Sequence, residues 1–288
     1  MLSFTPPTLR IPDAMDSAGL RELLTFYADA GVDEPLLDEA PDRFQETRAE
    51  AEKRAAQRQQ PTQQKPVATR QPNPAAPAAV KAAVPDDAQA ARAREIAKNA
   101  ESLDALRDLL STFDGCNLKT TAKNTVFADG NPQASVMFVG EAPGRDEDIQ
   151  GLPFVGRSGK LLDRMLAAIG LDRTSVYISN VIPWRPPGNR DPSPLETEIC
   201  RPFIERHIEL VAPKVLVTLG NPSTKLLLNT QTGIMRMRGN WAMHKTPSGL
   251  DIPTMPTLHP AYLLRNPAHK KLAWQDFLQI KLKLESAH

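Results

Sequence analysis

Cysteine is scarce in this sequence of 288 residues, with Cys116 and Cys200 as the only two. Two thiols cannot build a disulfide-rich scaffold or a metal site of four thiolates. The sequence also lacks any apolar run of 18 residues, and its start, MLSFTPPTLR, has no basic segment followed by an apolar one. These absences argue against membrane insertion and secretion. We therefore expect a cytoplasmic protein that makes no use of a membrane.

An excess of charge of one sign is lacking too, because 35 Lys and Arg residues balance 34 Asp and Glu residues. The total charge thus gives no sign of a nucleic-acid-binding protein. It conceals a polarity along the chain, since residues 1–50 are mainly acidic and residues 51–100 mainly basic. Aromatic residues make up only 5% of the chain, whereas the 27 prolines exceed the usual share of about 5%.

Residues 1–48 form an acidic N-terminal segment in which one amphipathic helix is predicted. Apolar residues recur there at helical spacing, and Gly31 can end the helix. They are Leu20, Leu23, Leu24 and Tyr27. Docking of this helix on the main domain and recruitment of a protein partner both remain open. Residues 49–86, rich in Ala, Pro and Gln, have almost nothing that could build a core, so we predict a disordered linker.

Helical patterns alternate with apolar runs of strand length over residues 87–288. Residues 86–113 are predicted to be helical, in one or two pieces. Runs such as VMFVG (136–140) and VLVTLG (215–220) show no polar alternation, which is typical of strands buried on both faces. We predict one α/β domain with a mainly parallel sheet between helix layers. Ligands bind such sheets beyond the carboxyl ends of the strands, so the segments after the strands should converge.

The segment after the first of these strands is GEAPG, residues 140–144. A carboxylate between glycines at a strand end, here Glu141, lies where backbone amides point into a cleft, which favours a functional role over a bracing one. GLPFVGRS (151–158) nearly matches a phosphate-binding loop, but such a loop follows its strand directly and this one does not. We therefore disfavour nucleotide hydrolysis. Phe154 is either a core residue or a platform for stacking.

Two later strand ends also have unusual polar residues. Asn180 precedes the rigid basic loop WRPPGNR (184–190) and offers a donor beside an acceptor, which suits a base edge; an Asx turn is the alternative. His259 ends another strand and belongs to the same predicted rim. Arg185 and Arg190 are candidate phosphate contacts, although solvated arginines are the default interpretation.

These motifs, in this order, resemble the uracil-DNA glycosylase superfamily. The resemblance rests on GEAPG with RDEDIQGLPFVGRSG, ISNVIPWRPPGNRDPSP, VLVTLGN, RMRGNW and LHPAYLLR, over roughly residues 103–284. The sequence is similar in particular to the family 4 enzymes, a bacterial and archaeal group related to a phage DNA-polymerase-associated domain. The resemblance implies a three-layer α/β/α fold with a four-stranded, mainly parallel sheet. It also implies hydrolysis of the N-glycosidic bond to a uracil flipped out of DNA.

The resemblance assigns roles to the residues at the strand ends. Phe154 would stack on the uracil and Asn180 would bind its edge. His259 would donate to O2, while Glu141, with Glu147 in the same loop, would position or deprotonate the attacking water. The residues expected to bind uracil are Phe154, Asn180, Gly140 and Ala142.

The expected contacts with DNA come from the resemblance and from the basic residues near the rim. Leu263 and Leu264 would fill the vacated stack, and Arg265 would bind a phosphate or the minor groove. The full expected set is Arg185, Arg190, Arg238, Leu263, Leu264 and Arg265.

One departure from the family concerns its iron-sulfur cluster. Family 4 enzymes typically hold a four-iron four-sulfur cluster through four cysteines, and the matching positions here are Phe113, Cys116, Trp184 and Cys200. Two thiolates cannot complete such a ligand set. We expect that the cluster is lost, that no cofactor is bound and that Phe113 and Trp184 fill its volume.

Together these features predict a monofunctional uracil-DNA glycosylase of base excision repair that acts as a monomer on uracil in single- or double-stranded DNA. No lysine stands at the matched rim positions, as a lyase would require. A non-catalytic DNA-binding or damage-recognition protein on the same fold is the alternative. We expect the protein in the bacterial cytoplasm, associated with the nucleoid, with its N-terminal helix available to a protein partner.

Overall fold

A computed structural model describes residues 86–286. The predicted helix within residues 1–48 and almost all of the predicted linker over 49–86 lie outside this range. The described part begins with two helices, α3 (Asp86–Lys98) and α4 (Leu103–Thr112), so the helix predicted over 86–113 forms in two pieces. Ser102 begins α4, because its side chain accepts a hydrogen bond from the backbone of Ala105.

A sheet of six strands in the order β1-β3-β2-β4-β6-β5 forms the middle layer. β3, β2, β4 and β6 run parallel at its centre, while β1 and β5 pair antiparallel at the edges. The mainly parallel sheet is confirmed, but it has six strands where the resemblance implied four, because the short antiparallel strands β1 and β5 extend it at both edges. The strands are β1 (Ala128–Gly130), β2 (Val136–Gly140), β3 (Tyr177–Asn180), β4 (Val215–Leu219), β5 (Ala242–Lys245) and β6 (Asp251–Thr257).

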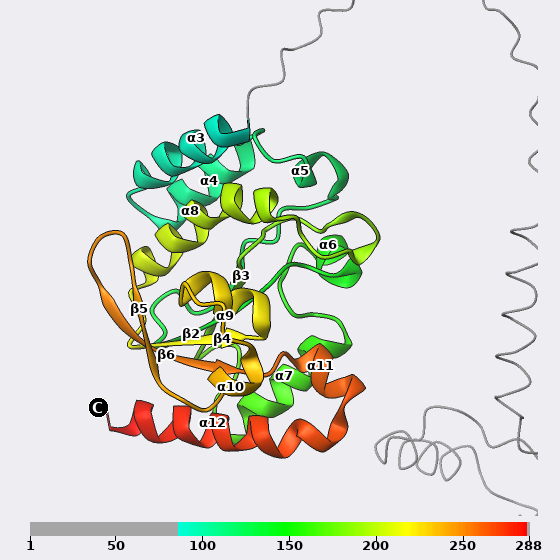
Figure 1. Cartoon of the computed structure of the whole chain (residues 1–288), viewed down its shortest axis with the longest axis vertical. Helices are drawn as coiled ribbons and strands as arrows, with labels where there is room; N and C mark the ends of the chain where they lie inside the picture. Colours follow the sequence, from blue (N-terminus) through cyan, green and yellow to red (C-terminus); the bar gives the residue numbers. More distant parts are fainter. Residues whose placement is uncertain (1–85, 287–288) are drawn as a thin grey trace, which may run out of the picture. The chain divides into compact units, whose positions relative to one another are not determined.

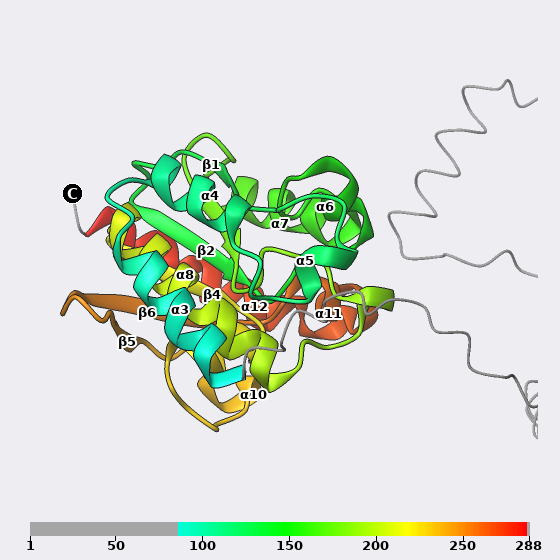
Figure 2. The ribbon, with the colours of Figure 1, turned by 90° about the horizontal axis from the view of Figure 1, so that it is seen from above.

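Helices cover both faces of the sheet (Figure 1). One face packs against α3, α4, α8 (Pro194–Val211) and α9 (Asn221–Leu227), the other against α7 (Arg157–Ala168) and α12 (Lys270–Glu285). Seen from above, α3 and α8 lie in front of the strands and α12 behind them (Figure 2). β2 supplies both cores, since Met137 belongs to the first and Phe138 to the second. The predicted three-layer α/β/α fold is confirmed.

Short elements follow the carboxyl ends of the parallel strands. Gly140 and Asn180 are register partners at the ends of β2 and β3, so the loops that follow start side by side. These elements are α5 (Leu118–Thr121), α6 (Arg145–Gln150), η1 (Pro187–Asn189), α10 (Ile234–Met237), α11 (Pro260–Arg265) and η2 (Pro267–His269). Within residues 86–286, none of the helices has the length and apolar character that crossing a bilayer requires.

Candidate active site

A polar pocket of about 310 Å³ opens at the carboxyl ends of the central strands. The loop after β2 contributes Glu141, the end of β3 contributes Asn180, and the segment after β6 contributes His259. Phe154 reaches the pocket from the loop before α7. These four residues are 118 positions apart at their extremes, from 141 to 259, and the parallel sheet brings them together as predicted.

Gly140 allows Asn180 and Phe154 to approach each other closely. A Cβ at Gly140 would lie 2.4 Å from Oδ1 of Asn180 and 2.7 Å from Cζ of Phe154. Asn180 is buried, and its Oδ1 has no hydrogen-bond partner. An unpaired buried acceptor costs free energy unless a ligand supplies a donor. The alternative of an Asx turn fails for this reason, and Asn180 presents an acceptor for an N–H group beside an aromatic ring.

His259 is held in one neutral tautomer by the helix that follows it. It is the N-cap of α11, and its Nδ1 accepts a hydrogen bond of 3.1 Å from the backbone N–H of Ala261. Burial, with a further effect of the positive charge of Arg265, lowers the pKa of His259 to about 4. The neutral ring therefore has its proton on Nε2 and can donate it to a ligand. Its centroid lies 5.4 Å from that of the Phe154 ring, so both rings border one space.

Glu141 is a half-buried carboxylate at the end of β2. Burial, and next the negative charge of Asp191, raise the pKa of its carboxyl group. Asp191 lines the same pocket, although nothing in its local sequence marked it in advance. A carboxylate whose pKa is raised is a stronger proton acceptor than an exposed one, and this suits the activation of a water molecule.

The carboxylate of Glu147, which we expected to help Glu141, is hydrogen-bonded to the backbone of the neighbouring loops. Its Oε1 accepts hydrogen bonds of 3.0 Å from the backbone N–H groups of Val155 and Gly156, and its Oε2 accepts one of 3.1 Å from Gly144. Both oxygens are thus engaged by main-chain donors. Glu147 lines the pocket and ties the Glu141 loop to the Phe154 loop, and this geometry favours positioning of the loops over direct contact with the attacking water.

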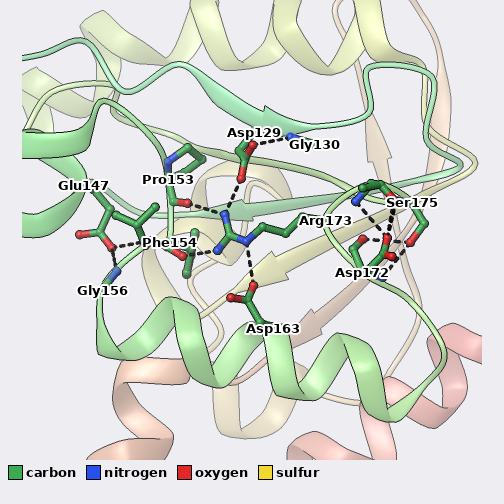
Figure 3. Close-up of polar contacts among 12 residues, drawn as sticks. Asp129, Gly130, Glu147, Pro153, Phe154, Gly156, Asp163, Asp172, Arg173 and Ser175 are labelled. Carbon is green, nitrogen blue, oxygen red and sulfur yellow. Dashed lines mark hydrogen bonds and ion pairs between the residues drawn. The ribbon is translucent and has the colours of Figure 1, made fainter.

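Phe154 depends on Arg173, which sequence reasoning missed. Its φ of 55° is unusual for a residue other than glycine, and its carbonyl accepts a hydrogen bond from the Arg173 guanidinium (Figure 3). The guanidinium also pairs with Asp129 at 2.5 Å and Asp163 at 2.8 Å. A Cβ at Gly159 would lie 1.7 Å from the Phe154 carbonyl oxygen, so only glycine fits there. Arg173 stands in an ordinary loop of the sequence, and only the fold brings it to Phe154.

The arginines of the WRPPGNR loop are constrained by hydrogen bonds. Arg190 pairs with the buried Glu196 through contacts of 2.6 and 2.8 Å, and this pairing holds the pKa of Glu196 down at about 2. Arg185 donates to the side chain of Asn189 at 2.7 Å. Arg190 lines the pocket, but its charge is compensated, whereas Arg265 lines the pocket without an ion pair among the described residues. Arg265 is therefore the stronger candidate for a phosphate.

Two expected DNA contacts are engaged within the fold instead. Arg238 donates to Asp276 and to the Leu272 carbonyl, which joins the end of α10 to α12. Leu263 is only 1% exposed and belongs to a small core cluster. Leu263 is therefore not accessible to DNA, and the charge of Arg238 is already compensated by Asp276. Leu264, 37% exposed, remains available.

The positions of the family's cluster ligands lie together in the α3–α4–α8 core. Aromatic rings pack in this core. The ring centroids of Phe113 and Phe203 lie 5.1 Å apart in an edge-on arrangement, and the indole N–H of the buried Trp184 donates to the Thr125 hydroxyl at 3.0 Å. Cys116 and Cys200 are buried free thiols in the same core. Residues 86–286 offer no group of three or more side chains that could hold a metal ion. The donor set does not fit a four-thiolate cluster, and we call Phe113, Trp184 and Phe203 the aromatic plug.

Comparisons with known proteins agree with this geometry. Residues 127–278 match the family model described as the uracil DNA glycosylase superfamily. The type-4 uracil-DNA glycosylase of Sulfurisphaera tokodaii is 40% identical over 186 residues, 63% of this chain and 84% of that protein. The enzyme of the same name from Archaeoglobus fulgidus is 41% identical over 184 residues, 62% of this chain and 92% of that protein. A DNA polymerase of Bacillus phage SP01 is 28% identical over 148 residues, which cover 51% of this chain and 15% of the polymerase.

Proposed function

The chain belongs to the uracil DNA glycosylase superfamily, and we propose that it hydrolyses the N-glycosidic bond of uracil in DNA, leaving an abasic site. The observation that carries the proposal is the buried, unpaired Oδ1 of Asn180 in the pocket that Phe154 and His259 also line. A flipped-out base brings both the ring and the N–H group that this space lacks.

Recognition of uracil follows from the polarity of the Asn180 amide. Oδ1 accepts from N3–H of uracil, while the amide NH₂ donates to O4. Cytosine has an unprotonated N3 and an amino group at C4, so both contacts would be repulsive or unpaired. Buried groups left unpaired in this way give discrimination of about 10⁴. The Phe154 ring, held rigidly by Arg173, supplies the surface on which the base stacks.

Bond cleavage is favoured by the neutral His259. As the glycosidic bond breaks, negative charge spreads over the departing uracil, and a donor at O2 stabilises the transition state more than the ground state. Nε2 is available for this purpose because Nδ1 already accepts from Ala261. No proton has to leave His259 at this step, since a hydrogen bond suffices.

Glu141 acts on the other reactant. Its carboxylate positions a water molecule and accepts its proton as the water attacks the sugar carbon, and its negative charge favours the cationic sugar. Glu147 sets the position of the loop through three backbone N–H groups. No lysine of the described residues lines the pocket, which supports a monofunctional hydrolase over a lyase.

The finer points of the proposal concern partners. We propose that the protein acts as a monomer on DNA, and that the segment 1–48 is the place for a protein partner. A non-catalytic role in damage recognition is not favoured, because a binding module needs neither a buried carboxylate nor a fixed neutral histidine in its pocket.

The proposed reaction is tested with end-labelled oligonucleotides that contain one uracil, single- and double-stranded, followed by alkaline cleavage of abasic sites. We expect cleavage at the uracil and none in matched oligonucleotides with thymine or cytosine. Glu141→Gln, which keeps the shape of the side chain, is the matched inactive control. DNA binding without any cleavage at micromolar protein would favour the non-catalytic alternative.

A further inference from the structure

A second, apolar groove of about 190 Å³ lies between α7, α11 and α12, outside the pocket described above. It is lined by Leu161 and Met165 of α7, Leu263 of α11 and Trp274 of α12. Arg164 and Lys270 flank it. Figure 1 shows these three helices side by side on one side of the described domain.

The groove and the uracil pocket share α11 as a common wall. Ala261 and Arg265 of this helix line the pocket, whereas Leu263 lines the groove. Only this one short helix separates the two, so a strand of DNA whose uracil occupies the pocket has the groove within reach. The exposed Leu264 lies on the same short helix.

Two cations that line the groove, and three others on the same two helices, lack acidic partners among residues 86–286. Arg157, Lys160 and Arg164 are exposed on α7 at intervals of three and four residues, which puts them on one side of the helix. Lys270 and Lys271 are exposed at the start of α12. None of these five makes an ion pair with a described residue, in contrast to Arg190 and Arg238. Phosphate is the natural counter-charge for a row of uncompensated cations.

Trp274 differs from the other exposed tryptophan of the described range. Trp274 is 43% exposed and no aromatic or cationic group of the described residues covers its ring. Trp241 is 37% exposed, and the ammonium group of Lys283 lies 5.7 Å from the centroid of its ring. An open indole in one groove with two cations is a combination that suits an unpaired nucleotide, whose base can stack on the ring and whose phosphates can pair with the cations.

We propose that this groove binds the single strand that flanks the flipped-out uracil, with one unpaired base stacked on Trp274 and its neighbouring phosphates on Arg164 and Lys270. The inference rests on the proposed function, because the pocket must hold a nucleotide of the same strand. A base inside a duplex cannot reach the indole face, so the groove favours single-stranded DNA over duplex DNA. The apolar lining of the groove would also suit a side chain of a protein partner, but the two uncompensated cations favour a polyanion such as DNA.

Binding can be measured without any excision by using a thymine homopolymer and fluorescence anisotropy. Trp274→Ala should weaken binding about tenfold, as loss of one stacked base does, while Trp274→Tyr should restore most of it. Arg164→Gln and Lys270→Gln should each reduce the slope of log Kd against log salt by about one. Trp241→Ala is the matched control and should bind like the unaltered protein. Unaltered binding by Trp274→Ala would overturn the proposal.

Excision gives an independent readout. Trp274→Ala should lower kcat/KM on a long single-stranded substrate about tenfold and leave the value on a blunt duplex nearly unchanged. Equal losses of kcat/KM on both substrates would contradict the proposal. Sedimentation gives a second check: a dimer of the unaltered protein that Trp274→Ala dissociates would contradict the proposal too, because a second copy of the chain would then occupy the groove. If the protein binds the homopolymer through Trp274 but never releases uracil from DNA, the proposed function is wrong and the proposal about the groove is still supported.

Discussion

The uracil pocket and the aromatic plug are two regions that a family comparison would mark as ligand sites, and they are built in opposite ways. In the pocket, Asn180 keeps a buried oxygen without a partner and Phe154 holds a strained φ. In the plug, Phe113 and Trp184 are almost fully buried, and the indole N–H of Trp184 has its acceptor. A site that binds a ligand retains unsatisfied groups and strain, whereas a region with no ligand to bind packs as ordinary core.

The largest effect should come from emptying the plug. Phe113→Ala removes a fully buried ring, so the free energy of unfolding should fall by about 3–5 kcal/mol in urea denaturation, with excision by the folded fraction little changed. Phe113→Leu, which retains most of the volume, should cost less. A loss of excision in fully folded Phe113→Ala would show that the plug shapes the pocket and would break the comparison.

The next largest effect concerns His259. His259→Asn retains an oxygen that can cap α11 but is too short to donate to O2, so the single-turnover rate should fall by about 10²–10³ with an unchanged melting temperature. His259→Ala loses the cap as well, so its free energy of unfolding should also fall by about 1 kcal/mol. If His259→Asn excised uracil at the normal rate, the catalytic role of Nε2 would have to be given up.

Asn180→Asp sharpens the polarity of recognition. It retains an acceptor but loses the donor to O4, so uracil excision should slow by about 5- to 150-fold, from a cost of about 1–3 kcal/mol. The ratio of uracil to cytosine excision should also narrow, because a carboxyl group can accept from the cytosine amino group. Asn189→Asp, the same change elsewhere in the pocket lining, is the control. An unaltered uracil rate in Asn180→Asp would remove Asn180 from the recognition of the base.

The smallest effect is a shift in pH dependence. Burial and Asp191 raise the pKa of Glu141 above its ordinary 4.5, and the ionised form is the active one. The rate should therefore fall as the pH falls, with a midpoint above 4.5, and Asp191→Asn should move the midpoint down. His259 loses its neutral form only at still lower pH, near its pKa of about 4. A midpoint at or below 4.5 in the unaltered protein would contradict the raised pKa.

Much of the fold could be predicted because its central strands are continuous apolar runs and its helices have periodic patterns. The residues of the pocket were predictable because parallel strands bring their carboxyl ends together. Burial and pairing were not predictable. We expected Leu263 at the DNA from the resemblance and Arg238 from its positive charge, and only the tertiary contacts show that Leu263 is buried in a small core cluster and that Arg238 pairs with Asp276. Arg173 was missed for the same reason, since its contacts with Asp129 and Phe154 join segments 44 and 19 residues away.

The central claim is that the unpaired Oδ1 of Asn180 accepts a hydrogen bond from the N3–H group of bound uracil. The most direct measurement compares single-turnover excision from oligonucleotides that differ only in uracil against 3-methyluracil, whose N3 has no hydrogen. We predict that the methyl group lowers the rate by roughly 10² or more, because Oδ1 stays unpaired and loses its space. Asn180→Ala should excise both bases at similar, low rates. Equal rates for the two bases in the unaltered protein would contradict the account.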